Sequence, residues 1–292
     1  MYTQFFGNFL LSKGYITNEQ LFDALKEKAQ KHAKLGTLAI HSGLMTAAEV
    51  DSVIVEQTHQ DKKFGELTIE MGYLTDEQVK ELLSIQSPDF LLLGQILLDK
   101  GIIDNTTLEK SIHDYRSENA ISDFDMVLED KDSINHLIGH FFANTGIDPS
   151  AIDIMYLELL FNSFIRFVGD DYTPLSAEIC DSFSADCMVR QDIEGSYAIS
   201  TYIGMSQTTA INFASRYVNE SFSVYDEYVQ ASLDDFLNLN NGLFLVNCSN
   251  DQALELTLTA PEHFDGQTRS FNKACKLKLL YPFGAIYFII EF

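Results

Sequence analysis

Residues 35–57 read LGTLAIHSGLMTAAEVDSVIVEQ, and this pattern decides the fold of the first part of the chain. The same arrangement occurs every 29 residues, also at 6–28, 64–86 and 93–115, and we number the four repeats in chain order. Each repeat contains two glycines seven residues apart, which are Gly7/Gly14, Gly36/Gly43, Gly65/Gly72 and Gly94/Gly101. A fixed period of this length indicates repeated supersecondary units.

Each repeat predicts a short helix, a turn and a longer helix. The second glycine suits the left-handed conformation that ends a helix, where a Cβ atom would clash. Three residues later a Thr or Asp can cap the next helix, because its side-chain oxygen accepts a hydrogen bond from a free backbone N–H. These capping residues are Thr17, Thr46, Thr75 and Asp104. Apolar residues follow at helical spacing, so residues 1–116 are predicted to form a small all-α domain of four helical hairpins.

The repeats resemble the N-terminal domain of type II secretion and type IV pilus ATPases, the GspE/MshE N-terminal family. In its nucleotide-binding form that family reads Arg-Leu-Gly-x2-Leu-x3-Gly-x6-Leu-x3-Leu-x2-Gln, and tandem copies bind cyclic di-GMP. The glycine spacing matches in all four repeats, but none of them has the arginine. Repeats two and three alone keep a cation at the first position and a glutamine at the last.

The resemblance therefore places a cyclic di-GMP ligand, if one binds, at repeats two and three. The candidate residues are Lys34, Leu35, Gly36, Gly43, Gln57, Lys63, Phe64, Gly65, Gly72 and Gln86. A lysine cannot form the two parallel bonds that an Arg fork makes with a phosphate or a guanine edge. The alternative is a repeat module that docks a protein or spaces two domains. The chain has no Gly-x4-Gly-Lys-Ser/Thr sequence, so the ATPase activity of those relatives is not expected.

The chain is strongly acidic. It has 292 residues and a formal charge of −24. Residues 1–116 carry 11 Lys and Arg against 17 Asp and Glu, and the remainder carries 8 against 26. Because such a surface repels phosphate backbones and anionic lipids, the composition argues against nucleic-acid binding and membrane-surface binding.

The cysteines and the apolar segments exclude further classes. The four cysteines form no CxxC pair and no histidine cluster accompanies them, so neither a zinc site nor a disulfide framework is expected. No apolar run is long enough to span a bilayer, and the N-terminus lacks the basic segment of a signal peptide. We therefore expect a cytoplasmic protein with buried free thiols.

The 29-residue register ends after Arg116. Residues 117–150 are predicted to form an acidic connector with one helix, Ser133–Ala143, and residues 151–292 to form a second domain. The predicted elements of that domain are a helix from Asp153 to near Gly169, strands Ala177–Val189 and Tyr197–Ile203, helices Ser206–Tyr217 and Ser223–Asn241, strands Gly242–Cys248 and Ala253–Ala260, and a hairpin of Ala274–Tyr281 with Gly284–Phe292. This order predicts an α+β layer with long helices on one face of a mainly antiparallel sheet.

One helix of the second domain carries a candidate active site. Asp235 and Asn238 are i, i+3 neighbours, so a carboxylate and an amide share one face of the predicted helix. Ala231 and Gly242 extend this face with small residues, which a partner backbone can approach closely. Gly242 is also predicted to end the helix. Pro261 follows 23 residues after Asn238.

This stretch resembles the CheC/CheX/FliY family of chemotaxis phosphatases, whose motif is Asp/Ser-x3-Glu-x2-Asn-x22-Pro. Asn238 and Pro261 have the family spacing, while Asp235 stands at the glutamate position and Ala231 at the Asp/Ser position. A single motif copy, in the later helix, makes the chain more similar to CheX than to CheC. Together, the two resemblances imply an all-α helical-hairpin repeat domain followed by an α+β CheC/CheX-like domain.

The resemblance also implies a function in a two-component system. It predicts that the chain binds a CheY-like response regulator and hydrolyses its aspartyl phosphate. Asp235 would pair with a lysine of the receiver, Asn238 would orient the attacking water, and Ala231, Gly242 and Pro261 would contact the receiver. The receiver would supply Mg²⁺, so no cofactor or metal of the chain's own is expected, and relatives that pair through their sheets imply a homodimer. The alternative is a catalytically inactive scaffold that binds a receiver or another protein.

Overall fold

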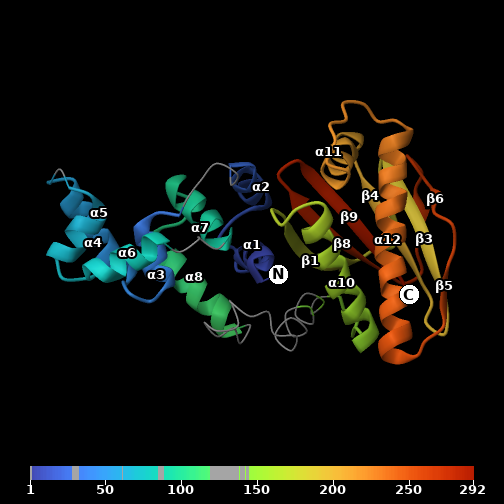
Figure 1. Ribbon diagram of the computed structural model, residues 1–292, viewed down its shortest axis with the longest axis horizontal. Helices are drawn as coiled ribbons and strands as arrows, with labels where there is room; N and C mark the ends of the chain where they lie inside the picture. Colours follow the sequence, from blue (N-terminus) through green and yellow to red (C-terminus); the bar gives the residue numbers. More distant parts are fainter. Residues whose placement is uncertain are drawn as a thin grey trace. The chain divides into compact units, whose positions relative to one another are not determined.

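The computed structural model describes residues 2–27, 33–60, 62–84, 89–118, 138, 142 and 145–292. The chain divides into two compact units, Tyr2–Leu128 and Glu129–Phe292, and each is described by itself (Figure 1). The predicted connector 117–150, with its helix Ser133–Ala143, lies largely outside the described residues.

The described part of the first unit is built from helices that follow one another in pairs. The pairs are α1 (Tyr2–Ser12) with α2 (Asn18–Glu27), α3 (Leu35–His41) with α4 (Ala47–Gln57), α5 (Phe64–Glu70) with α6 (Asp76–Ser84), and α7 (Asp89–Asp99) with α8 (Asn105–Glu118). The predicted left-handed conformation of the second glycines is confirmed. Their φ angles are +73° at Gly14, +66° at Gly43, +76° at Gly72 and +64° at Gly101.

The predicted caps are present as well. Thr46 and Glu49 form a reciprocal capping box at the start of α4, where each side chain bonds the backbone N–H of the other. Thr75 does the same with Gln78 at the start of α6. At the start of α8 the Asp104 carboxylate accepts a hydrogen bond from the backbone N–H of Thr107 at 2.7 Å. The relation of this unit to the GspE/MshE N-terminal family stays a prediction.

The first glycine of a pair lets the two helices of a hairpin cross closely. A Cβ atom added at this position would crowd a side chain fourteen residues later, on the second helix of the same repeat. These close pairs are Gly36 with Val50 (3.0 Å), Gly65 with Val79 (3.1 Å) and Gly94 with Leu108 (2.8 Å). The period therefore repeats a packing contact as well as a turn.

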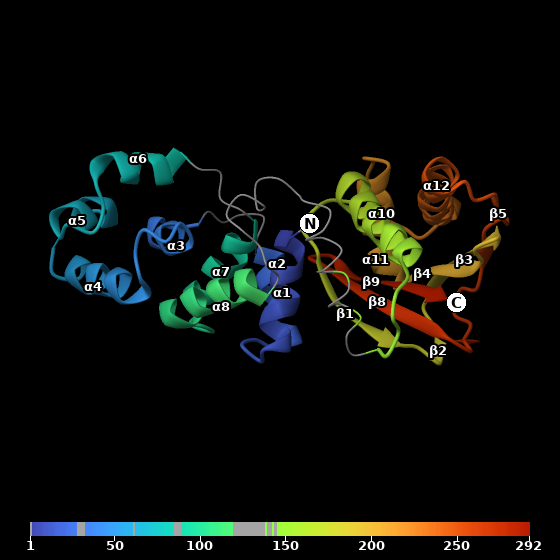
Figure 2. The ribbon, with the colours of Figure 1, turned by 90° about the horizontal axis from the view of Figure 1, so that it is seen from below.

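The repeats do not pack in chain order. Repeat four lies between repeats one and two, and repeat three packs on the other side of repeat two (Figure 2). The Phe6 ring of α1 meets the rings of Phe90 and Tyr115, on α7 and α8, with centroid distances of 5.3 and 5.2 Å. Gln95 of α7 accepts a hydrogen bond from the backbone N–H of Lys34, at the start of α3, at 3.0 Å. Repeat four therefore contacts both repeat one and repeat two, although repeat three lies between repeats two and four in the chain.

The second unit is an antiparallel sheet covered by helices. The strands are β1 (Thr173–Ile179), β2 (Ser182–Phe183), β3 (Cys187–Gly195), β4 (Ile199–Met205), β5 (Leu256–Leu258), β6 (Glu262–His263), β7 (Arg269–Ser270), β8 (Ala274–Tyr281) and β9 (Gly284–Glu291). The main sheet has the order β1-β8-β9-β4-β3-β5, β6 also pairs with β3, and β2 pairs with β7 in a separate ribbon. The described part of this unit is therefore α+β, as predicted.

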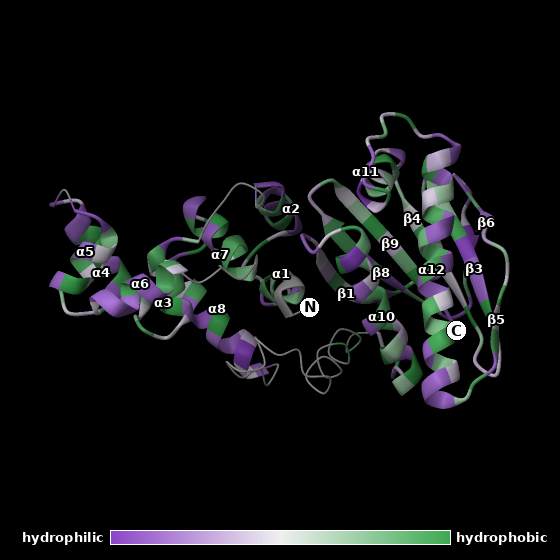
Figure 3. Cartoon of the chain, in the orientation of Figure 1, coloured by the Kyte–Doolittle hydropathy of each residue, from purple (hydrophilic) through white to green (hydrophobic). Residues whose placement is uncertain are grey.

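Three helices pack on one face of this sheet: α10 (Ala151–Phe167), α11 (Gln207–Tyr217) and α12 (Glu227–Gln252). Phe288 of β9 faces them and lies 6.1 Å from the Tyr156 ring of α10. The α12 residue Phe236 packs against Phe164 of α10 (4.7 Å) and Phe213 of α11 (5.3 Å). In Figure 3 α12 carries hydrophobic and hydrophilic residues in turn along its length, as a helix with one buried face does.

Two predictions about α12 are wrong. The helix does not end at Gly242, and residues 242–248 are not a strand, because α12 continues to Gln252. Phe244 and Cys248 extend the buried face of Phe236 by two and three further turns, and both are fully buried. The helix ends instead at Ala253, whose φ of +52° supplies the left-handed conformation.

The strand predicted at Ala177–Val189 is also wrong in its bounds. It covers parts of β1 and β3, which are separated by the short β2 and do not pair with each other. β1 begins earlier, at Thr173, and contains Pro174. A proline is tolerated there because β1 is the outermost strand of the sheet.

Two glycine substitutions test the corrected course of α12. Gly242→Ala is expected to raise the free energy of unfolding by about 0.5–1 kcal/mol, because alanine is favoured inside a helix and a Cβ atom there meets nothing within 4 Å. Gly284→Ala is the matched control. It is expected to lower the same quantity by about 1–3 kcal/mol, since its φ is +146° and its Cβ would lie 2.2 Å from Thr209. Urea unfolding measures the free energy of unfolding of both variants. A Gly242→Ala variant that is less stable than the wild-type chain would contradict a helix that continues through Gly242.

Candidate functional site

The predicted site residues lie on the exposed face of α12. Asp235 and Asn238 are both exposed, and so is Ala231 one turn earlier. Gly242 lies on the same face and is half-buried. The opposite face, with Phe236 and its apolar neighbours, is buried against α10 and α11. The carboxylate and the amide therefore project to solvent from a rigid helix.

Asp235 is held by a tyrosine of the neighbouring helix. The Tyr217 hydroxyl, at the end of α11, donates a hydrogen bond of 2.6 Å to Asp235 Oδ2. The Tyr217 ring stacks on Phe213 and meets Phe236 edge to face. Burial, followed by the bond to Asp235, raises the pKa of Tyr217, so its hydroxyl keeps the proton that it donates.

Asn238 is held from inside the protein. Gln191 of β3 donates from Nε2 to Asn238 Oδ1 at 2.8 Å, and the same nitrogen donates to the main-chain oxygen of Thr259 at 3.0 Å. Gln191 is fully buried although Asn238 is exposed. One side of the Asn238 amide is thus fixed by the core, and the other faces solvent.

A larger polar network supports this contact. Asn241, also on α12, donates from Nδ2 to Gln191 Oε1 at 2.9 Å and to the Thr201 hydroxyl at 3.0 Å. Its Oδ1 accepts from the Tyr156 hydroxyl at 2.6 Å. These four side chains are fully buried, and they join α10, α12, β3 and β4.

Sequence reasoning missed this network. The Asn240–Asn241 pair, directly after the motif and at positions where the apolar stripe turns to the core, was the available signal. A buried Asn requires partners, and its presence on the inner face of α12 points to polar residues on the strands below. Nothing in the sequence identified Gln191 as the partner on β3.

Pro261 belongs to the segment between β5 and β6, which lies beside α12. It is half-buried between β5 and β6. The preceding Thr259 exchanges main-chain and side-chain hydrogen bonds with Asp192 of β3. On the other side, His263 of β6 places Nε2 2.9 Å from Asp234 Oδ1 on α12. The segment is thereby tied to the sheet and to the helix beside the candidate site.

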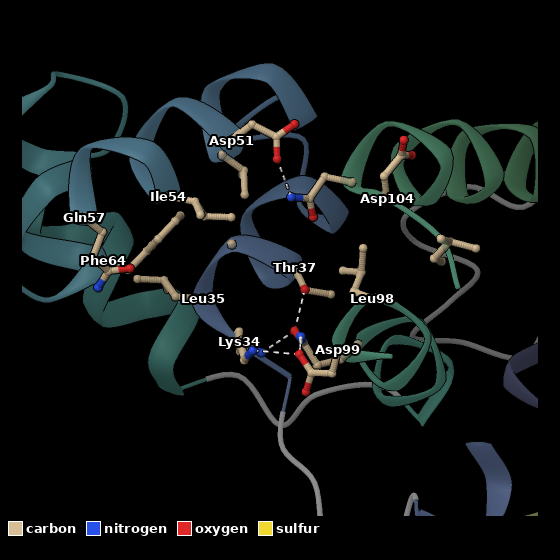
Figure 4. Close-up of a pocket in the computed structure, with 15 residues that line it drawn as sticks. Lys34, Leu35, Thr37, Asp51, Ile54, Gln57, Phe64, Leu98, Asp99 and Asp104 are labelled. Carbon is tan, nitrogen blue, oxygen red and sulfur yellow. Dashed lines mark hydrogen bonds and ion pairs between the residues drawn. The ribbon is translucent and has the colours of Figure 1, made fainter. Parts of the chain in front are cut away.

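A second candidate site lies in the first unit. Between repeats two, three and four is a cavity of about 700 Å³ (Figure 4). Five of the ten predicted nucleotide-binding residues line it, namely Lys34, Leu35, Gly36, Gln57 and Phe64. Gly43, Lys63, Gly65 and Gly72 do not line it, and Gln86 lies outside the described residues. The rest of the wall comes from other residues of repeat two and from repeat four, and sequence reasoning did not place repeat four there.

The lining of this cavity carries more negative charge than is expected of a site that binds a nucleotide's phosphates. Three carboxylates line it, Asp51, Asp99 and Asp104, and Lys34 is the one cation among its described lining residues. The Lys34 ammonium already lies 2.7 Å from Asp99 Oδ1. Hydrogen bonds from Thr107 lower the pKa of Asp104, which keeps it charged. A ligand with two phosphates meets net repulsion here, and cyclic di-GMP binding stays a prediction.

The residues that the structure describes hold no group of three or more His, Cys, Asp or Glu side chains arranged to bind a metal ion. Their helices include none with the length and apolar character to cross a membrane. All four cysteines are buried and are free thiols.

Comparisons with known proteins find similarity in structure over about half of the chain. No protein-family model matches the sequence, and no curated protein matches it. A CheC-like superfamily protein from Shewanella sp. PV-4 is similar in structure, with a TM-score of 0.43 and 16% identity over 49% of this chain and 98% of that one. A CheX from Desulfovibrio desulfuricans has a TM-score of 0.42 and 13% identity over 48% and 98%.

A third solved structure is the CheX–CheY–BeF3–Mg+2 complex from Borrelia burgdorferi. Its TM-score is 0.37, with 18% identity over 47% of this chain and 94% of that one. Structural neighbours over about half of this chain are therefore CheC- and CheX-like chemotaxis proteins.

One substitution tests the wall of the cavity in the first unit. Gln95 is buried, and its Oε1 accepts from the Lys34 backbone N–H and from the Thr37 hydroxyl. Gln95→Leu leaves both donors without an acceptor and is expected to lower the free energy of unfolding by about 1–3 kcal/mol. The control Gln57→Leu changes an exposed glutamine of the same cavity, and we expect a change within about 0.5 kcal/mol. Equal effects in thermal or urea unfolding would contradict a junction between repeats two and four at Gln95.

Proposed function

We propose that the second unit binds a phosphorylated CheY-like response regulator and speeds the hydrolysis of its aspartyl phosphate. The observation that carries this proposal is the Asn238 amide, which is exposed on α12 yet fixed from the core by Gln191. Its spacing to Asp235 and Pro261 is the spacing of the CheC/CheX/FliY motif, with Asp235 in place of the motif's glutamate and Ala231 in place of its Asp or Ser. We identify the partner as a CheY-like response regulator because of the resemblance to that motif.

The chemistry fits an amide. In the hydrolysis, a water oxygen attacks phosphorus, the bond between phosphorus and the receiver's aspartate oxygen breaks, and inorganic phosphate leaves. Phosphoryl transfer depends mainly on positioning and charge neutralisation. An amide positions water without being ionised, and the receiver's own Mg²⁺ would neutralise the charge. The chain then contributes orientation through Asn238 and affinity through Asp235.

A binding protein without catalysis is the second candidate. It is favoured by Asp235, which is one methylene shorter than the family's glutamate and is already bonded to Tyr217. A carboxylate that accepts from Tyr217 at Oδ2 still has Oδ1 for a receiver lysine, so it retains binding. In either case we propose that the repeats dock or regulate the chain. A homodimer stays a prediction.

Asn238→Ala separates the two candidates. We expect the wild-type chain to accelerate phosphate loss from a phosphorylated receiver, and the variant to lose about 100-fold of that rate while its receiver affinity changes little. Phosphate release is measured with a panel of receivers phosphorylated by a small phosphodonor, and affinity by calorimetry with the beryllofluoride form. Asn250→Ala, an exposed asparagine on the same helix, is the control. Binding without acceleration by the wild-type chain would assign the scaffold function.

Asp235→Glu tests the role of the acid. The added methylene extends the carboxylate toward the receiver lysine, and we expect affinity to increase by up to about fivefold, because an exposed ion pair contributes up to about 1 kcal/mol. Asp235→Asn keeps the size and the Tyr217 bond but removes the charge, and we expect a comparable loss. Calorimetry at low and high salt measures both, since screening reduces an ionic contribution. Equal affinities for all three chains would remove Asp235 from the interface.

A further inference from the structure

Two main-chain oxygens, which can only accept, set the direction of the hydrogen bonds around Gln191. The main-chain oxygen of Thr259 can only accept, so the atom of Gln191 that meets it at 3.0 Å must be the Nε2 donor. The same Nε2 meets the Asn238 side chain at 2.8 Å. Asn238 must therefore present its oxygen inward, because two NH₂ groups cannot bond each other.

The other end of the network fixes Gln191 independently. The Thr201 hydroxyl donates to the main-chain oxygen of Gln191 at 2.8 Å, so toward Asn241 it can only accept. Asn241 consequently presents Nδ2 to Thr201, and the same nitrogen meets Gln191 Oε1 at 2.9 Å. The Tyr156 hydroxyl donates to Asn241 Oδ1 and completes the chain. Both ends assign the same orientation to Gln191.

Burial keeps this orientation. Gln191, Thr201, Asn241 and Tyr156 are all fully buried, so water is not at hand to pair a reversed amide. Reversing Gln191 would set Oε1 against the Thr259 oxygen and Nε2 against the Asn241 nitrogen. Each buried polar group left unpaired costs about 1–3 kcal/mol, so the reversed state is essentially unpopulated.

We propose that Gln191 is a positioning residue that holds Asn238 with Oδ1 inward and its Nδ2 protons toward the partner, so that Asn238 acts only as a hydrogen-bond donor. This rests on the proposed function of the same site. Asn238 then holds the oxygen of the attacking water, or a phosphoryl oxygen, and takes no proton. The proton released as water attacks phosphorus passes to an oxygen of the phosphoryl group or of the departing receiver carboxylate.

The orientation is testable without any partner. In NMR hydrogen exchange of the unliganded full chain, the side-chain amide protons of Gln191 and Asn241 are expected to be protected and those of Asn238 to exchange rapidly. In Gln191→Met, which keeps the size but removes the donor, the Asn238 amide is released and its two amide resonances are expected to shift and broaden. Protected Asn238 protons in the wild-type chain would overturn the proposal.

The catalytic consequence is read separately. With a phosphorylated receiver, Gln191→Met is expected to lower the maximal dephosphorylation rate about tenfold or more, with receiver affinity within about threefold of wild type. Gln230→Met, the same change on α12 at a glutamine that bonds Asp265 instead, controls for the loss of one amide. Asn238→Asp retains the inward oxygen but presents an acceptor outward, and we expect it to be inactive.

These outcomes separate the two proposals. An unchanged rate in Gln191→Met, or an active Asn238→Asp, would overturn the donor role while the proposed phosphatase function stands. If the wild-type chain accelerates no receiver, the phosphatase function fails, and the exchange experiment still decides the orientation of Asn238. Far-UV circular dichroism and urea unfolding show that Gln191→Met is folded. If it is not, Gln191→Glu, examined above and below the pKa of the introduced carboxyl, replaces it, and we expect activity only where that group is protonated and can donate.

Discussion

The packing of α12 on the sheet depends on one buried hydrogen-bonded group, the Asn241 amide between Tyr156, Gln191 and Thr201. An apolar helix face tolerates rotation and sliding over a sheet, since hydrophobic burial is non-directional. A buried amide does not, because any shift of about 1 Å breaks bonds whose loss costs about 1–3 kcal/mol each. Asn241 therefore sets the rotation and the axial position of α12. Because α12 is fixed in this way, Asn238, one turn earlier, lies at the edge of the core. Its Oδ1 faces inward to Gln191, and its Nδ2 faces solvent.

In the first unit the corresponding constraint is steric. The first glycine of repeats two, three and four removes the Cβ atom at which two helices cross, and Gly94 with Leu108 is the tightest of these contacts at 2.8 Å. Identical hairpins can associate in more than one order, and the order is decided by the side chains between them. Gln95 joins repeat four to repeat two by capping α3 at Lys34, so repeat four lies between repeats one and two, which are neighbours in the chain. The walls of the cavity thus come from repeats two, three and four. Its net charge depends on all three and cannot be read from the sequence of one repeat.

Local signals in the sequence predicted the local structure well. Helix caps, left-handed glycines and the final hairpin depend on residues close together in the chain, and their chemistry is readable there. Gly242 was misread because glycine permits a left-handed conformation but does not require one, and the burial of Phe244 and Cys248 decides in favour of a continuing helix. The face that carries Asp235 and Asn238 followed from helical spacing alone. What holds these side chains did not, since Tyr217 and Gln191 lie on other elements and reach the site only through the tertiary fold.

The two site residues are supported differently, and this difference bears on their roles. Asp235 is bonded at the surface by the Tyr217 hydroxyl through Oδ2, which leaves Oδ1 to meet a partner. Asn238 is bonded to a fully buried residue, Gln191, which is itself bonded to Asn241 and to the main chain of Thr259. Affinity tolerates adjustment on binding, whereas the rate of an in-line displacement depends on a preorganised geometry. Under the proposed function, the fixed amide of Asn238 therefore serves the rate of hydrolysis, and the carboxylate of Asp235 serves affinity for the receiver.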